Sequence, residues 1–172
     1  MPAASISIRP LLKQDGELYK VHRLEALQQH PEAFAASYEE EKSQSVQSFE
    51  ERLSSSNAIT FGAFAGDELT GSVTLFRESK VKMQHKAYLF AMYVSEEHRG
   101  KGIAKTLINE AIKKARECSD IEQLYLTVMS ENHSAKRLYE SYGFKTYGVE
   151  TNALKVDGAY YDEDHMMLIL RH

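Results

Sequence analysis

The segment EEHRGKGIAKTLINEAIKKA, residues 96–115, is the part of the sequence that best indicates the fold. It starts as a loop with two glycines among basic residues and continues directly into an amphipathic helix. The apolar residues of that helix recur every three or four positions, which places them on one face toward a core. They are Ile103, Leu107, Ile108, Ala111, Ile112 and Ala115. The segment therefore predicts a strand-to-helix turn followed by a helix that packs on a sheet.

The same loop has the properties of an anion site. Gly100 and Gly102 let backbone N–H groups turn toward one point, and the start of the helix adds unpaired donors and the positive end of its dipole. Arg99 and Lys101 add positive charge. A pyrophosphate fits this set, which comprises Arg99, Gly100, Lys101, Gly102, Ile103 and Ala104. The alternative is a plain turn whose glycines only set the backbone angles.

Two well-known phosphate-binding patterns do not match this loop. The Walker A pattern would end correctly at Lys105 and Thr106, but it needs glycine where Arg99 and Ala104 stand. The dinucleotide pattern begins at Gly100, yet Lys105 stands where a small residue should allow close packing of helix on sheet. A nucleotide-binding enzyme is therefore only a distant alternative.

Composition narrows the class of protein further. The chain has 172 residues, of which 42% are hydrophobic, so we expect one domain over residues 1–172. The net charge of -4 gives no reason to expect nucleic-acid binding. Cys118 is the only cysteine, which excludes an internal disulfide and favours a reducing compartment. The sequence has no secretory signal and no run long enough to cross a membrane, so we expect a cytoplasmic protein.

The first half of the chain predicts a strand, two helices and then three strands. The stretch SISIRP predicts a strand that ends at Pro10. An amphipathic helix with Asp15 as its N-cap is expected next, and its apolar face would comprise Leu18, Val21, Leu24 and Leu27. VQSFEERL, residues 46–53, predicts a second helix. A hairpin around Gly66 and Asp67 and a buried central strand, KAYLFAMYV, follow.

The second half predicts a strand, a helix and a closing hairpin. QLYLTV is the expected strand, and Ser130 and Asn132 offer caps for a helix that stops at Gly143. Asp157 and Gly158 give the strongest turn signal in the chain. The expected fold is α/β in the broad sense (α+β), with a mixed sheet and helices on both of its faces.

Two motifs, in this order, resemble those of the GNAT family of N-acetyltransferases. The family's acyl-CoA loop, Arg/Gln-x-x-Gly-x-Gly/Ala, is matched by Arg99, Gly102 and Ala104. Its second segment, Asn-x-x-Ala-x-x-Leu-Tyr-x-x-x-Gly-Phe, is matched in full by Asn132, Ala135, Leu138, Tyr139, Gly143 and Phe144. The order of elements agrees over nearly the whole chain. The resemblance implies a mainly antiparallel central sheet that splays beside acetyl-CoA.

The resemblance also implies which residues hold acetyl-CoA. Residues 99–104 would wrap the pyrophosphate through backbone amides. The strand through Met92, Tyr93 and Val94 would pair with the pantetheine arm, which resembles a peptide. In the helix that is predicted to stop at Gly143, one face would contact the cofactor. Its residues are Asn132, Ala135 or Lys136, and Tyr139. No metal is expected, because the seven histidines show no ligand spacing.

Acetyl transfer to an amine poses two proton problems. An alkyl ammonium with a pKa of about 10.4 must lose a proton, at roughly 4.6 kcal/mol at pH 7, whereas protonating the leaving thiolate is a smaller task of roughly 2 kcal/mol. Tyr139 stands at the family's usual general-acid position and would protonate the thiolate. The general base stays open, because the central strand has no carboxylate. The candidates are His85, Tyr88, Tyr93, Glu25 and a water chain.

We therefore expect an acetyl-CoA-dependent N-acetyltransferase that works by direct attack in a ternary complex. The acceptor classes left open are polyamines, amino acids, aminated antibiotics and protein amines. We expect neither nucleic acid nor membrane as a partner, and the resemblance implies a homodimer. The alternative is a catalytically weak acyl-CoA-binding sensor or regulatory module, in which the same motifs bind the cofactor but amine activation is poor.

Overall fold

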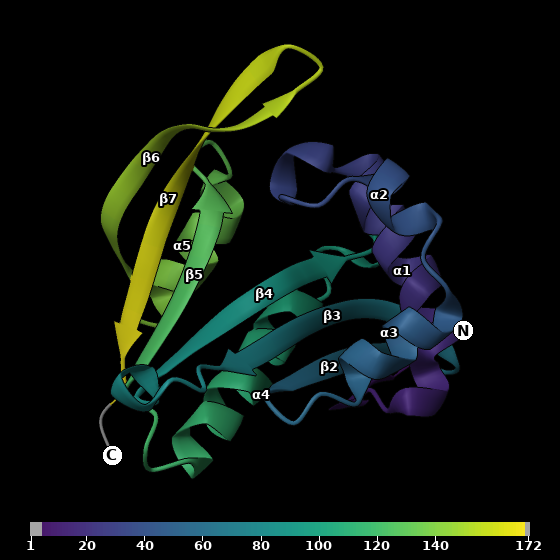
Figure 1. The fold of residues 1–172 in the computed structure, drawn as a ribbon, viewed down its shortest axis with the longest axis horizontal. Coiled ribbons are helices and arrows are strands. Elements are labelled where there is room, and N and C mark those ends of the chain that lie inside the picture. The colour runs from purple at the N-terminus through teal and green to yellow at the C-terminus, as the bar shows by residue number, and fades with distance from the viewer. Residues whose placement is uncertain (1–4, 171–172) are drawn as a thin grey trace.

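The computed structural model describes residues 5–170 and shows one curved sheet with helices against it (Figure 1). The strands are β1 (Ile6–Pro10), β2 (Ala58–Ala65), β3 (Glu68–Arg77), β4 (Lys86–Val94), β5 (Gln123–Met129), β6 (Lys145–Val156) and β7 (Ala159–Ile169). The helices are α1 (Gly16–Gln29), α2 (Tyr38–Lys42), α3 (Val46–Leu53), α4 (Ile103–Glu117) and α5 (His133–Ser141). Short 3-10 turns are η1 (Lys13–Asp15), η2 (Pro31–Ala33), η3 (Val81–Met83) and η4 (Glu96–His98).

The strands form a seven-stranded sheet in the order β1-β2-β3-β4-β5-β7-β6. Every neighbouring pair is antiparallel except β4 and β5, which are parallel and joined by the long crossover through α4. This parallel pairing covers only Lys86–Tyr88 of β4 and Gln123–Tyr125 of β5. The predicted mixed, mainly antiparallel sheet is therefore confirmed, and Figure 1 shows the two strands diverging above their short contact.

The register of β4 assigns its side chains to two faces of the sheet. Tyr88, Phe90 and Tyr93 pair with alternate positions of β3, so their side chains share one face, which we call the front face. Leu89 and Val94 pair with the positions in between and lie on the opposite, back face. A regular strand would put Phe90 and Tyr93 on opposite faces. The central strand therefore contains an irregularity between them.

That irregularity is a β-bulge at Ala91. Ala91 has a φ of 53°, and the β3–β4 register shifts between Ser72 and Thr74. One extra residue in β4 restores Tyr93 to the front face and turns the backbone of the strand that follows. A positive φ is unfavourable for alanine, so the neighbouring ladder must hold it in place. No glycine or other local feature of the sequence marks this bulge.

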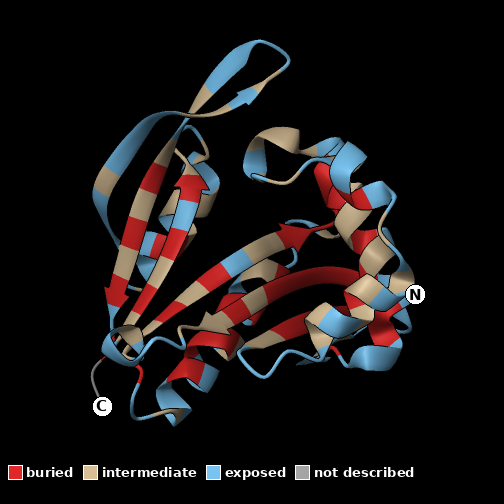
Figure 2. Ribbon diagram, viewed as in Figure 1, coloured by how far each residue is buried: buried red, intermediate tan, exposed pale blue. Residues whose placement is uncertain are grey.

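Helices cover both faces of the sheet, as predicted. On the back face, a Cβ at Gly71 would meet Ile103 and Leu107 of α4, and Tyr139 of α5 belongs to the same core cluster as the back-face residues of β5. On the front face, α1 and α3 form a smaller cluster that includes Tyr19 and Phe49. Figure 2 shows the buried stripe of α4 against the sheet and the exposed tip of the β6–β7 hairpin.

The predicted face of α1 is wrong in the first half of the helix, whereas Leu27 in the second half is buried as predicted. Leu18 and Val21 are 44% and 65% exposed, whereas Tyr19 and His22, one position further along, are buried. The helix docks through its aromatic residues: Tyr19 meets Phe49 of α3 edge-on, with ring centroids 6.1 Å apart. Aromatic rings bury more area than the aliphatic residues that set the predicted pattern. Helix α2 was not predicted.

Asp15 also acts differently from a helix cap. It precedes α1, but its side chain makes no cap hydrogen bond to that helix. Its carboxylate instead accepts from the Leu12 backbone at 2.7 Å and from the Arg9 guanidinium at 2.8 and 2.9 Å. These hydrogen bonds lower the pKa of Asp15, Arg9 first. Asp15 therefore ties the end of β1 to η1.

Candidate active site

The loop before α4 has the backbone geometry that an anion site needs. Gly100 and Gly102 have φ values of 76° and 77°, in the left-handed region, and a Cβ at either would meet nothing within 4 Å. The first intrahelical bond runs from Thr106 N–H to the Gly102 carbonyl at 3.1 Å. The N–H groups of residues 103–105 thus have no intrahelical acceptor. Lys101 between the glycines is exposed, so an anion could approach freely.

Arg99 is exposed, but both ends of its guanidinium group are anchored. Its Nε donates to the Val94 carbonyl at 3.1 Å, and its guanidinium lies 5.9 Å from the centre of the Tyr93 ring. The other end of the guanidinium donates to His30 Nε2 at 2.9 Å, so that ring nitrogen must carry the lone pair. Arg99 therefore joins the loop to the end of β4 and to the residue that follows α1.

Beside this loop, β4 and β5 have parted. We call residues 89–94 of β4 and 126–129 of β5 the splay, because these segments do not pair with each other. Each segment remains paired on its other side, β4 with β3 and β5 with β7. The inner edges of the splay therefore keep free backbone groups on rigid strands. Met92, Tyr93 and Val94, the predicted pantetheine residues, form the end of the β4 edge next to Arg99.

Helix α5 brings the second motif to the same end of the sheet. Asn132 is its N-cap, with Oδ1 accepting from the Ala135 N–H at 3.2 Å. Ala135 is half-buried against the core, which leaves room for a close approach. At the other end of the helix, the Tyr142 hydroxyl donates to the Lys105 carbonyl in the first turn of α4 at 2.9 Å. The two predicted motifs are therefore neighbours in space.

Lys136, a predicted cofactor residue, is held by an ion pair. Its ammonium lies 2.8 Å from the buried Asp164 carboxylate on β7. Asp164 also accepts from the hydroxyls of Ser130 at 2.5 Å and Thr146 at 3.2 Å. The hydrogen bond from Lys136 and then that from Ser130 lower the pKa of Asp164. This network fixes α5 on the sheet, and Ser130 contributes to it instead of capping the helix.

Tyr139 lies deep in the core. It is 7% exposed and meets Phe144 edge-on, with ring centroids 6.0 Å apart. Burial raises the pKa of the Tyr139 phenol to about 12, so the hydroxyl stays protonated at neutral pH. The structure gives this hydroxyl no hydrogen-bond acceptor within residues 5–170. Tyr139 is therefore a proton donor without a described acceptor.

Two of the candidate bases are in direct contact. The Tyr93 hydroxyl lies 2.9 Å from Glu25 Oε1 and 2.9 Å from Gln29 Oε1, both on α1. Burial and then the hydrogen bond to Glu25 raise the pKa of Tyr93 above its ordinary value. Tyr88 lies on the front face where the splay begins. His85 lies just before β4, at the opposite end of the strand from Val94.

The structure adds a group that the sequence analysis missed. On the front face, Thr127 Oγ1 lies 3.2 Å from His165 Nδ1, and His165 Nε2 lies 3.3 Å from Glu150 Oε2. The three residues come from β5, β7 and β6. Thr127 and His165 lie opposite each other because of the register of β5 against β7, which local sequence patterns do not predict. The residues after His165, MMLIL, are all apolar, so no alternation in the sequence could have placed His165 on one face of the strand.

Aromatic rings form a row on the same face. Tyr88 stacks on Phe90 with centroids 5.7 Å apart and tilts against Tyr125 at 5.5 Å. Tyr125 meets Tyr147 at 5.8 Å, and Tyr147 lies 6.1 Å from His165. The row therefore runs from β4 across the start of the splay to β6 and β7.

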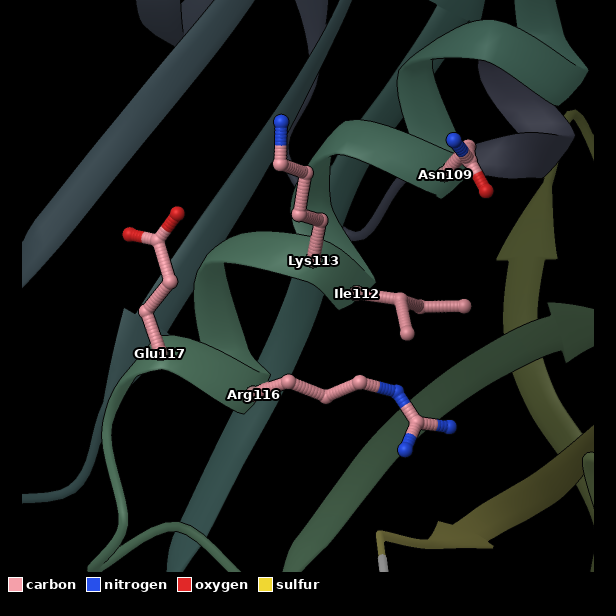
Figure 3. Close-up of a pocket in the computed structure, with 5 residues that line it drawn as sticks. All are labelled: Asn109, Ile112, Lys113, Arg116 and Glu117. Atoms are coloured by element: carbon pink, nitrogen blue, oxygen red, sulfur yellow. The ribbon is translucent and has the colours of Figure 1, made fainter. Parts of the chain in front are cut away.

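One surface hollow lies away from these residues. A pocket of about 450 Å³ lies along the outer surface of α4 and is lined by Asn109, Ile112, Lys113, Arg116 and Glu117 (Figure 3). It contains none of the predicted site residues. The free backbone donors and strand edges are chemically better suited to a ligand than this pocket. Across residues 5–170, no helix is long and apolar enough to span a membrane, and no three metal-ligating side chains gather.

The sequence and the fold both match known proteins. Residues 20–144 match the acetyltransferase (GNAT) family. The chain is 32% identical over 105 residues to spermidine N(1)-acetyltransferase of Vibrio cholerae, a match that covers 61% of this chain and 59% of that protein. It thus spans less than two thirds of that relative.

Solved structures share the fold at low sequence identity. A GNAT-family acetyltransferase of Streptococcus pneumoniae superposes with a TM-score of 0.87 at 22% identity, covering 96% of this chain and 100% of that one. The protein yncA of Salmonella typhimurium, whose structure contains acetyl-CoA, superposes with a TM-score of 0.84 at 19% identity, covering 98% of this chain and 95% of that one.

Proposed function

Because this chain belongs to the GNAT family of acetyltransferases, we propose that it transfers the acetyl group of acetyl-CoA to a primary amine. The reaction is a direct attack of the amine on the thioester within a ternary complex, carried out by a single N-acetyltransferase domain. The observation that carries the proposal is the splay of β4 and β5 next to a loop of left-handed glycines at the start of α4.

The loop is suited to the pyrophosphate of acetyl-CoA. Free N–H groups at residues 103–105 and the two left-handed glycines can surround one anion, and the dipole of α4 favours negative charge there. Lys101 and Ala104 belong to the same loop and would also lie beside the anion. Arg99 takes a second role, because its contacts with Val94 and His30 hold the loop against β4.

The inner edge of β4 is suited to the pantetheine arm. Its amides can bond the unpaired backbone groups along Met92, Tyr93 and Val94 as an added strand would, except the Val94 carbonyl, which already accepts from Arg99 Nε. On the other side, Asn132 and Ala135 lie at the start of α5, and Ala135 offers little steric hindrance. The fixed ion pair of Lys136 gives it a positioning role for α5 instead of a direct grip on the cofactor.

Tyr139 would serve the leaving sulfur as a hydrogen-bond donor. With its pKa at about 12, the phenol is neutral at pH 7 and can donate to a thiolate. Complete transfer to a thiolate whose conjugate acid has a pKa of about 8.5 would be unfavourable by roughly 4.8 kcal/mol. The hydroxyl therefore stabilises the developing negative charge on sulfur, and solvent supplies the final proton.

Positioning supplies much of the remaining rate. An amine and a thioester held in the splay react as one unit, and a backbone N–H of β4 aimed at the carbonyl oxygen would stabilise the tetrahedral intermediate. The named relatives are acetyltransferases, which gives no support to the alternative of an acyl-CoA sensor.

Two measurements test this proposal. Thermal unfolding is followed with acetyl-CoA, coenzyme A, ATP and NAD, each at about 1 mM; a ligand bound at about 10 μM adds roughly 2.7 kcal/mol, or several degrees. Only the two CoA compounds should shift the midpoint. Thiol release from acetyl-CoA is then measured with spermidine, L-methionine, an aminoglycoside and a peptide with a free N-terminus. Equal shifts with ATP or NAD, or binding of acetyl-CoA without thiol release from any amine, would contradict it.

A further inference from the structure

We propose that Thr127, His165 and Glu150 form a proton relay that activates the acceptor amine, an inference that rests on the proposed acetyl transfer. The sheet brings the three residues together on the front face. Thr127 of β5 is the direct register partner of His165 on β7, and Glu150 of β6 lies opposite Glu163, two residues before His165 on the same face of β7. No helix lies between them.

The hydrogen bonds of His165 settle which nitrogen carries the proton in the neutral ring. A carboxylate can only accept, so Nε2 must be the N–H that donates to Glu150 Oε2 over 3.3 Å. Nδ1 then carries the lone pair and accepts from the Thr127 hydroxyl over 3.2 Å. This leaves the Thr127 oxygen with free lone pairs. The hydrogen bonds therefore run in one direction, from Thr127 through His165 to Glu150. A proton taken up by Thr127 can pass to His165 Nδ1.

The relay lies next to the place where the amine must approach. Thr127 is exposed and belongs to the β5 side of the splay, where β5 has separated from β4. The aromatic row with Tyr88 and Tyr125 lies at the base of the splay on the same face. An amine that enters from the front face can thus meet the Thr127 hydroxyl and a thioester held between the strands.

Several carboxylates lie near His165. Its charged and titratable neighbours are Glu150 and Tyr147 on β6 and Glu163 on β7, the last of which pairs directly with Glu150. η2 lies against β5 and β6 and adds Glu32, which is paired with His30 at 3.7 Å. Two facing carboxylates repel each other until a cation lies near them. An imidazolium at His165 would supply that cation.

The chemical step balances with these groups, Tyr139 and solvent. The ammonium gives a proton to Thr127 Oγ1 as the Thr127 proton passes to His165 Nδ1, so the imidazole becomes an imidazolium paired with Glu150. The free amine forms its bond to the acetyl carbon and the carbon–sulfur bond breaks. The second proton of the amine leaves to solvent, and the thiolate is stabilised by Tyr139. The imidazolium then releases its proton to solvent.

The relay is a better base than the Tyr93–Glu25 pair. The Tyr93 hydroxyl keeps its proton, because burial and the Glu25 carboxylate both disfavour its phenolate. Glu25 Oε1 is already engaged by that hydroxyl at 2.9 Å. An imidazole changes charge near neutral pH and is the most frequent general base in enzymes. Tyr93 and Glu25 instead fix α1 against the end of β4.

The experiment measures kcat/KM for the amine between pH 6 and 10, by thiol release, in the wild type and in His165→Gln. The amine is spermidine, or whichever of the four amines tested above gives the fastest thiol release. For His165→Gln we expect a loss of about 10²- to 10⁴-fold at pH 7. The loss should shrink toward pH 10, where an amine of pKa about 10.4 is substantially deprotonated in solution. Binding of acetyl-CoA should be unchanged. The control is His133→Gln, an exposed histidine with a similar 3.4 Å contact to Glu131.

The outcomes separate the relay from the proposed function. If the wild type releases thiol and His165→Gln keeps the same pH profile, the relay is wrong and the acetyltransferase stands. A loss that is equal at every pH would likewise overturn the relay, since a structural defect would produce it. If the wild type releases no thiol with any amine, both proposals fall.

Two further readouts do not depend on the amine screen. Nitrogen NMR of the free protein should find the Nε2–H tautomer at His165, and an Nδ1–H tautomer would overturn the relay. Glu150 is a positioning residue in this scheme. Glu150→Gln should shift the apparent pKa of the kcat/KM profile downward, because the imidazolium loses its carboxylate. Glu150→Asp should restore part of the shift, and an unshifted profile in Glu150→Gln would also refute the assignment.

Discussion

His22 makes the stability of this protein sensitive to mild acid. Its ring is 3% exposed on α1, its centroid lies 5.1 Å from that of Tyr93, and neither ring nitrogen has a hydrogen-bond partner within residues 5–170. Burial first, and the nearby Arg23 second, lower the pKa of His22 to about 4. The folded protein therefore keeps His22 neutral where the unfolded chain would already bind a proton.

The sign and size of the effect follow from proton linkage. Between the ordinary pKa of 6.5 and about 4, the unfolded state holds more protons at His22, so stability falls as the pH falls through this window. The full difference corresponds to about 3.4 kcal/mol, of which about 2 kcal/mol is lost between pH 7 and pH 5. Above pH 6.5 the residue has no such effect.

Urea unfolding at pH 7 and pH 5 measures this loss, with His22→Phe as the comparison. The variant should lack about 2 kcal/mol of the acid sensitivity of the wild type. It should also be more stable at pH 7 by roughly 1 to 3 kcal/mol, because two unpaired buried polar atoms are removed. Equal losses in the two proteins, or an NMR titration of His22 near 6.5, would refute the reasoning.

Three other predictions concern the loop, the α5 anchor and the leaving group. Gly102→Ala should weaken acetyl-CoA binding. The control is Gly66→Ala, at a φ of 63° with nothing within 4 Å, which should cost similar backbone strain of roughly 1 kcal/mol without changing acetyl-CoA affinity. Equal affinity for acetyl-CoA in the two variants would contradict the loop assignment. Asp164→Asn should lower the free energy of unfolding by roughly 2 kcal/mol, measured in urea, because charge-assisted hydrogen bonds to Lys136 and two hydroxyls are weakened. Tyr139→Phe should lower turnover roughly 10²-fold with acetyl-CoA affinity unchanged, and an unaltered steady-state rate would remove Tyr139 from the chemistry.

The parts of the fold that could be predicted from the sequence carry local signals. Gly66, Gly102 and Gly143 all adopt the left-handed backbone that their turns require. The apolar spacing of α4 matches its buried face, and Asp157 and Gly158 both take the positive φ of a tight hairpin turn. Each of these features is decided within a few residues, so pattern and conformation agree.

The parts that could not be predicted depend on contacts between distant segments. The buried face of α1 depends on Phe49 and Tyr93, which lie outside the helix. Tyr19 packs against Phe49 and His22 packs against Tyr93, so these two residues are buried and Leu18 is exposed. The bulge at Ala91 has no glycine to mark it. The contact between Thr127 and His165 needs the register of β5 against β7, which is set by the whole C-terminal half of the sheet.

We expect the short parallel contact between β4 and β5 to divide the sheet into two folding units, although one core cluster packs against both. β1 to β4 are joined to each other by antiparallel ladders, and so are β5 to β7, while three residue pairs connect the two sets. Antiparallel hairpins between sequence neighbours close small loops and form early, whereas the parallel contact must wait until the crossover through α4 has folded. Amide hydrogen exchange should therefore reveal two cooperative units that open separately, with the amides of Ala87 and Leu124 exchanging at the rate of the less stable one. We therefore expect the place where substrates would meet to be the last part of the sheet to assemble and the first to open.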